Sequence, residues 1–116
     1  MHLAEFTTLI TGLPQADIPV EGVRAWILAA EGRQIAFFDI DPIGAVAEHT
    51  HEEQWGIVVE GEMSLTIGGV TKVYRQGDSY RIPAGVPHGA TFASHFRAID
   101  VFATATRYRA KGRGAE

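Results

Sequence analysis

Two histidines one residue apart open the stretch of this sequence with the clearest potential for chemistry. His49 and His51 lie in EHTHEEQWGIVVEGE, a segment that becomes strand-like and closes on Gly61. Successive side chains of a β-strand point to opposite faces, so both imidazoles can lie on one side. Such a pair can chelate a metal ion, but a transition metal needs three or four protein ligands. His88, which follows the rigid loop 83–87, is a candidate for a further ligand.

The composition limits the available ligands and partners. The 116 residues include no cysteine, which leaves histidine, carboxylate and amide groups as possible metal ligands. The net charge is −4 and the only basic run is the terminal RYRAKGRG, so we expect no nucleic-acid partner. No apolar run approaches the roughly 20 residues of a membrane span, and the N-terminus lacks the pattern of a signal peptide. We therefore expect a cytoplasmic protein without a membrane partner.

Short strands joined by glycine turns must position these histidines. Apolar runs at residues 23–28 and 34–39 flank a turn glycine and predict one hairpin. The alternating pattern at 63–67, the Gly68-Gly69 pair and the run 70–75 predict a second hairpin. Further strands are expected at residues 3–11, 80–82 and 91–103.

These patterns predict an all-β fold, with a jelly-roll barrel as the preferred architecture. We expect one domain over residues 1–103 and a flexible, basic C-terminal tail over residues 104–116. Inward-facing side chains converge inside a small barrel, which is where a metal site would lie. The small size and the apolar outer-face candidates Trp26, Trp55 and Val59 indicate a homodimer.

Two motifs make the chain resemble the cupin superfamily, whose small domains are double-stranded β-helix, or jelly-roll, barrels. The second cupin motif spaces a glycine, a proline, a glycine and a histidine as Gly77, Pro83, Gly85 and His88 are spaced here. That motif normally ends in asparagine four residues later. This chain has Phe92 at that position, which makes the pocket wall there more apolar.

The first cupin motif contains a histidine pair and then a glutamate seven residues before a glycine. His49 and His51 match the pair, but counting back seven residues from Gly61 reaches Gln54. The resemblance therefore implies that glutamine replaces the usual glutamate ligand. Regular strand alternation would instead favour Glu53, and Gln54 requires a turn or bulge after His51. The implied metal ligands are His49, His51, His88 and, in preference to Glu53, Gln54.

Other side chains could complete the pocket. Strand alternation places Phe92, Phe96 and Asp100 toward the site, and we expect Phe37 to join the two phenylalanines as core and pocket wall. An unpaired carboxylate in an apolar strand is costly, so Asp100 is expected to be either ion-paired or functional. Asp100 and Glu53 are the candidate catalytic groups.

The ligand types define the chemistry that such a site could perform. Three imidazoles and one amide are neutral, so a divalent ion would keep its full charge and would attract an anionic oxygen. These ligands suit Zn, Ni, Mn, Fe or Co. The resemblance thus implies a small bacterial metal-dependent enzyme of isomerase, cyclase or dioxygenase type that acts on a small organic anion. The alternative is a non-catalytic, metal-dependent binding or sensor protein, because the fold alone does not decide function.

Overall fold

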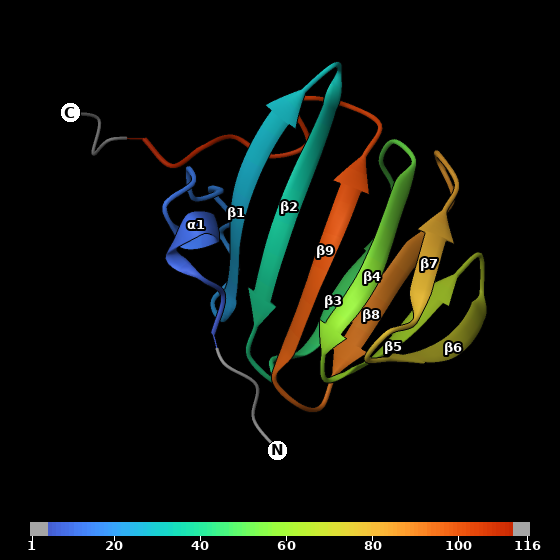
Figure 1. Cartoon of the computed structure of the whole chain (residues 1–116). Helices are drawn as coiled ribbons and strands as arrows, with labels where there is room; N and C mark the ends of the chain where they lie inside the picture. Colours follow the sequence, from blue (N-terminus) through green and yellow to red (C-terminus); the bar gives the residue numbers. More distant parts are fainter. Residues whose placement is uncertain (1–4, 113–116) are drawn as a thin grey trace.

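The structure, a computed structural model, describes residues 5–112 and consists mainly of antiparallel strands (Figure 1). A one-turn helix, α1 (Thr8–Thr11), precedes them. The strands are β1 (Val23–Ala30), β2 (Arg33–Ile40), β3 (Gly44–His49), β4 (Gln54–Glu60), β5 (Glu62–Ile67), β6 (Val70–Arg75), β7 (Ser79–Ile82), β8 (His88–Phe92) and β9 (Phe96–Phe102). Within residues 5–112, no helix is long and apolar enough to cross a membrane.

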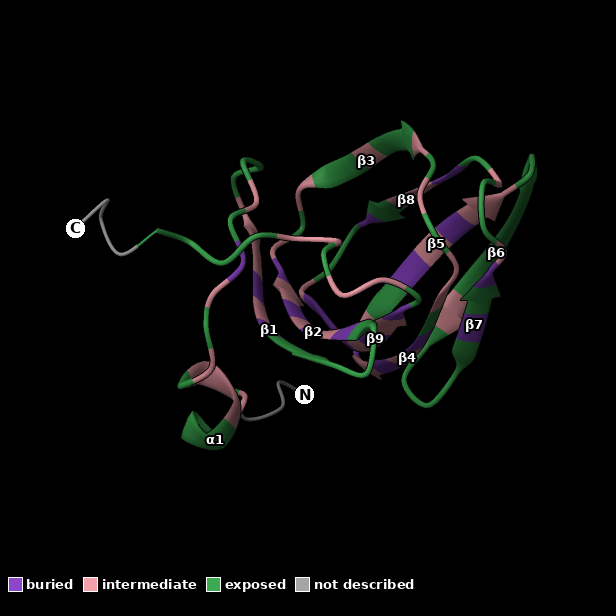
Figure 2. Cartoon of the chain, turned by 90° about the horizontal axis from the view of Figure 1, so that it is seen from above, coloured by how far each residue is buried: buried purple, intermediate pink, exposed green. Residues whose placement is uncertain are grey.

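Two sheets face each other across one hydrophobic core. The first has the strand order β1-β2-β9-β4-β7 and the second has the order β3-β8-β5-β6. Burial alternates along β2, β4 and β5, which Figure 2 shows as buried stripes on these strands. Because successive side chains of a strand point to opposite faces, the buried ones share the face toward the opposite sheet. This two-sheet, all-β architecture confirms the predicted jelly roll.

Both predicted hairpins are present. β1 and β2 pair along their whole length, and the chain turns between them at Glu31 and Gly32, which have φ values of +55° and +74°. β5 and β6 turn at Gly68 and Gly69, with φ values of +56° and +85°. Positive φ at both central positions matches the right-handed twist of the flanking strands, which explains the glycine pair.

Two predicted strands are wrong. In place of a strand over residues 3–11, the chain forms α1, and the Thr7 side chain accepts a hydrogen bond from the Leu9 amide at its start; residues 3 and 4 lie outside the described residues. The predicted strand 91–103 is two strands, β8 and β9, in different sheets. Residues 93–95 connect the two strands, so the alternation of inward and outward side chains does not continue from β8 into β9.

Residues 104–112, which the sequence assigns to a flexible tail, run alongside the segment before β1. The amide of Asp17 donates to the Arg109 carbonyl at 2.7 Å, and the Lys111 amide donates to the Gln15 carbonyl at 2.8 Å. The buried Gln34 side chain also bonds this segment at Ala105 and Tyr108. These bonds give residues 105–111 a definite place in the fold, whereas residues 113–116 lie outside the described part.

Candidate metal centre and cavity

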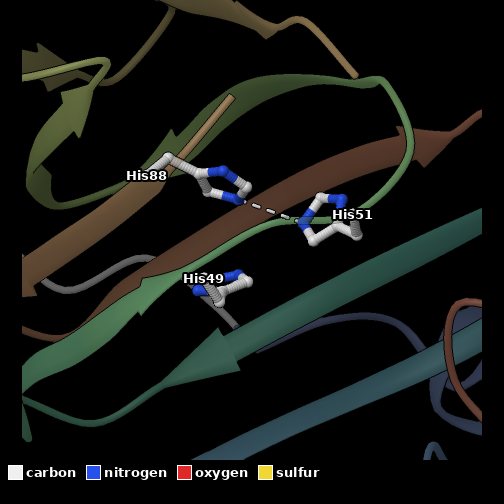
Figure 3. A group of neighbouring side chains, drawn as sticks. All are labelled: His49, His51 and His88. Atoms are coloured by element: carbon white, nitrogen blue, oxygen red, sulfur yellow. Dashed lines mark hydrogen bonds between the residues drawn. The ribbon is translucent and has the colours of Figure 1, made fainter. Parts of the chain in front are cut away.

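Three histidines meet at one end of the space between the sheets (Figure 3). His49 ends β3 and pairs in register with His88, which begins β8, while His51 lies in the loop from β3 to β4. Their ligand nitrogens all lie within 4.8 Å of one another. Nitrogens that share one ion at about 2.1 Å are at most about 4.2 Å apart, so a small inward rotation of the rings suffices. The cluster could hold a metal ion.

Hydrogen bonds fix which nitrogen of each ring carries the proton. The Nδ1 atoms of His49, His51 and His88 lie 2.9, 2.7 and 2.9 Å from the carbonyl oxygens of residues 47, 52 and 86. A carbonyl only accepts, so each Nδ1 is the donor and each neutral ring leaves the lone pair of Nε2 free. The His51 and His88 Nε2 atoms are only 3.0 Å apart. Two lone pairs at that distance need a proton or a cation between them.

Burial disfavours a proton between the two Nε2 atoms. It lowers the pKa of His51 to about 4. The hydrogen bond to the residue 52 carbonyl raises this pKa, whereas the nearby charges of Arg107, His88 and His49 lower it further. Burial likewise lowers the pKa of His88, together with His49 and Arg107. Neutral rings with exposed lone pairs are the form in which imidazole binds metal ions.

A polar cluster lies on the five-stranded sheet beside the histidines. The Asp100 carboxylate is fully buried and accepts hydrogen bonds from the Tyr80 hydroxyl at 2.9 Å and the Gln54 Nε2 at 2.6 Å. Burial raises the pKa of Asp100 to about 7, although both hydrogen bonds oppose the rise. Because Nε2 of Gln54 is the donor, its Oε1 is not used in this bond.

Gly56 makes this cluster possible. It lies on β4 opposite both Tyr80 on β7 and Asp100 on β9. A Cβ at this position would come within 2.4 Å of the Asp100 Oδ2 and 2.5 Å of the Tyr80 hydroxyl. The absence of a side chain therefore lets the two flanking strands bond to each other across β4.

The histidines and the Asp100 cluster line one cavity of about 300 Å³. This volume lies at the lower end of the range for small-molecule sites. Much of the wall is apolar, with Phe38, Ile40, Met63, Leu65, Phe92 and Phe96 among its residues.

A family comparison fits this architecture and this histidine pattern. The model of the cupin domain matches residues 36–102, which include the histidine cluster and Asp100. The chain belongs to the cupin family.

Individual relatives of this cupin include proteins of known name. It is 38% identical to the H2HPP isomerase of Bacillus subtilis over 71 residues, which are 60% of this chain and 30% of that protein. The cupin thus matches under a third of the length of that relative. An RmlC-like cupin from Shewanella frigidimarina is 29% identical, with a TM-score of 0.74 over 92% of this chain and 96% of that one. KdgF from Halomonas sp. shares the fold, with 24% identity and a TM-score of 0.69 over 79% of this chain and 86% of that one.

Two of the predicted site residues of the cupin lie away from the cavity. Phe37 packs edge to face against Phe6 on the outer side of β2, and its neighbour Phe38 lines the cavity instead. Glu53 bonds to Arg81 at 2.6 Å and is not among the cavity-lining residues. A continuous strand would favour Glu53 over Gln54, but β3 ends at His49 and the loop 50–53 crosses to the other sheet.

The remaining predicted residues line the cavity: His49, His51, Gln54, His88, Phe92, Phe96 and Asp100. The sequence analysis missed Arg107 and Tyr108, which also line it. Both were assigned to the flexible tail, since no spacing or alternation marks them. The sequence around them shows only a tyrosine between two arginines, Arg107 and Arg109, which is a weak pattern.

Proposed function

We propose that this cupin is a metal-dependent enzyme of the isomerase type that moves a proton within a small organic anion. The proposed ligands are His49, His51, His88 and the Oε1 atom of Gln54. The observation that carries the proposal is the convergence of three histidines whose Nδ1 atoms bond to carbonyl oxygens, with the Nε2 atoms of two of them 3.0 Å apart. A divalent ion bound there would polarise a carbonyl oxygen of the substrate.

Asp100 is the proposed proton carrier. It is the one carboxylate among the described residues that line the cavity, and Tyr80 and Gln54 hold it in place. In this proposal the carboxylate accepts a proton from a carbon next to the substrate carbonyl. The resulting carboxylic acid returns the proton to another carbon, so the reaction consumes no co-reactant. The isomerase name of the Bacillus subtilis relative supports this choice over cyclase or dioxygenase chemistry.

Metal titration tests the site. Protein stripped with a chelator is titrated with Zn²⁺, Mn²⁺ and, without oxygen, Fe²⁺. We expect one ion per chain, and an affinity more than about 100-fold lower in His88→Ala, because losing a ligand costs more than losing an outer hydrogen bond. His95→Ala is the matched control, because His95 bonds to Asp39 away from the cavity. Equal affinity in His88→Ala and wild type would overturn the proposed site.

Proton transfer is tested by NMR in D₂O with 2-oxobutanoate and 2-oxo-4-phenylbutanoate. Metal-loaded wild type is expected to catalyse deuterium incorporation next to the carbonyl. Asp100→Asn should bind metal but lose the exchange. Exchange that survives in Asp100→Asn would remove Asp100 as the proton carrier, and a bound ion without exchange in wild type would favour a binding or sensor protein.

We also propose that the protein is a homodimer that pairs through the outer face of the five-stranded sheet. Two apolar rows cross that face: Trp26, Phe37, Ile99 and Ile57, and next to them Leu28, Ile35, Val101 and Trp55. Phe6 packs against Trp26 and Phe37 in the first row, so the second row is the proposed centre of the contact. Leu28 and Trp55 remain 47% and 43% exposed, although such side chains favour burial. Sedimentation at the monomer mass would contradict this proposal.

A further inference from the structure

Arg107 brings a permanent positive charge to the cavity wall. It is the single arginine or lysine among the cavity-lining residues that the structure describes. It follows β9, in the segment that crosses near the histidines, and its charge acts on both His51 and His88. The charge therefore lies close to the proposed metal centre without belonging to it.

The fold holds Arg107 without using its hydrogen-bond donors. Its guanidinium lies over the Tyr108 ring at 4.3 Å and over the Phe102 ring at 5.7 Å. Hydrogen bonds attach the segment that contains Arg107 to Gln34, which is 2% exposed. The Gln34 amide donates to the carbonyls of Ala105 and Tyr108 at 3.2 and 3.0 Å, and its Oε1 accepts from the Tyr108 amide at 3.0 Å.

The guanidinium of Arg107 has no ion pair or hydrogen bond with any residue in the described range 5–112, and its Nε is buried without a protein partner. A buried donor of this kind calls for an explanation. Other arginines differ in this respect, because each of the following pairs with a carboxylate: Arg24, Arg75, Arg81 and Arg97.

The surroundings of Arg107 restrict what could bind to it. The planar, always charged guanidinium matches the geometry of a carboxylate. The rest of the cavity wall is rich in aromatic and aliphatic side chains, and its volume of about 300 Å³ has room for a ring-sized hydrocarbon. A ligand without a negative charge would leave the arginine unpaired, and a fully polar ligand would lose its hydration against the apolar wall.

We propose that the cavity binds a carboxylate with a compact apolar body, such as a ring, and that Arg107 binds the carboxylate while the apolar wall contacts the body. This inference rests on the proposed function, since both concern the same cavity, and it names the substrate class and the residue that selects it. Because Arg107 binds the carboxylate, the histidine centre and Asp100 can act on the reacting part of the ligand.

Calorimetric binding of two probes tests the proposal near neutral pH. 3-Phenylpropionate carries the carboxylate, and 3-phenylpropanamide is its neutral counterpart of the same shape. We expect wild type to prefer the carboxylate by about tenfold to hundredfold, the range for hydrogen bonds to charged groups. Arg107→Gln should abolish the preference while still binding the amide. Arg107→Lys should keep part of it, because a lysine retains the charge but loses the planar fork.

Arg109→Gln is the matched control, since Arg109 is exposed two residues away and is absent from the cavity wall. A preference that survives in Arg107→Gln, or is lost equally in Arg109→Gln, would overturn the inference, as would failure of both probes to bind wild type. All measurements are made on chelator-stripped and Zn²⁺-loaded protein. An Arg107-dependent preference in protein that binds no metal would support this inference and overturn the proposed metal site. Metal binding together with a carboxylate preference that does not depend on Arg107 would support the proposed metal site and overturn this inference.

Discussion

Histidines lie at both ends of β9, and their surroundings are opposite in kind. At the end near Phe102, His49, His51 and His88 gather, and their rings bond to backbone carbonyls and to no carboxylate of residues 5–112. At the start of the strand, His95 bonds to Asp39, which also pairs with Arg24. The same residue type thus has two roles. A carboxylate partner fixes a histidine as part of the structure, whereas carbonyl partners orient it and leave one nitrogen for another molecule.

The paired end includes a buried ion pair. Arg97, only 2% exposed, forms an ion pair with the buried Glu60 and lies 3.7 Å from Asp39. A buried pair of this kind is costly to break, because the remaining charge cannot reach water. The two ends should therefore respond differently to substitution and to pH.

The largest effect is expected from breaking the buried pair. Arg97→Met leaves Glu60 and Asp39 without this cation and should lower the free energy of unfolding by about 3–5 kcal/mol. Urea denaturation measures the change. Arg81→Met is the matched control, since the Arg81–Glu53 pair is exposed and should contribute less than about 1 kcal/mol. Equal losses in the two variants would contradict the distinction.

A smaller effect is expected from single histidine substitutions in metal-free protein. His95→Gln removes the bond to Asp39 and should cost about 1 kcal/mol of unfolding free energy. His49→Gln removes a ring whose Nε2 has no carboxylate to bind and should change stability by less than about 0.5 kcal/mol. Thermal unfolding with a chelator present compares the two. A greater loss in His49→Gln would mean that the open end also stabilises the fold.

A third difference is a pH dependence that belongs to the open end. The folded-state pKa of His51 is about 4, below its ordinary value of 6.5, so the unfolded chain binds more protons between these values. Stability of the metal-free protein should therefore fall as pH drops from about 6.5 to about 4. His51→Gln should flatten this part of the profile, which thermal unfolding at several pH values measures. An unchanged slope in His51→Gln would assign the dependence to other groups.

Much of the fold and part of the cavity lining were predictable from the sequence, for identifiable reasons. Local patterns gave the two hairpins, since the turn glycines and the alternation lie within a few residues of each other. Alternation does not continue where the chain changes sheet, at residues 50–53 and 93–95, and Glu53, the residue that regular alternation would favour over Gln54, pairs with Arg81 outside the cavity. Phe37 and Phe38 could not be told apart, because both faces of β2 are apolar.

The position of Arg107 in the cavity wall could not be predicted from such patterns, for a different reason. Its position depends on the Gln34 side chain, 73 residues earlier in the chain, which bonds to Ala105 and Tyr108. Nothing in the spacing of polar residues reveals a contact between a buried amide and a distant loop. The residue that we propose to select the substrate was therefore assigned to a tail.

The attachment through Gln34 also bears on how such a barrel can change its specificity. Gln34 recognises two carbonyls and one amide hydrogen of the segment, and these are groups that nearly every amino acid supplies. The side chain at position 107 can therefore be exchanged while the attachment is kept. The proposed metal centre can thus stay constant while one short segment outside the strands varies to meet a new ligand.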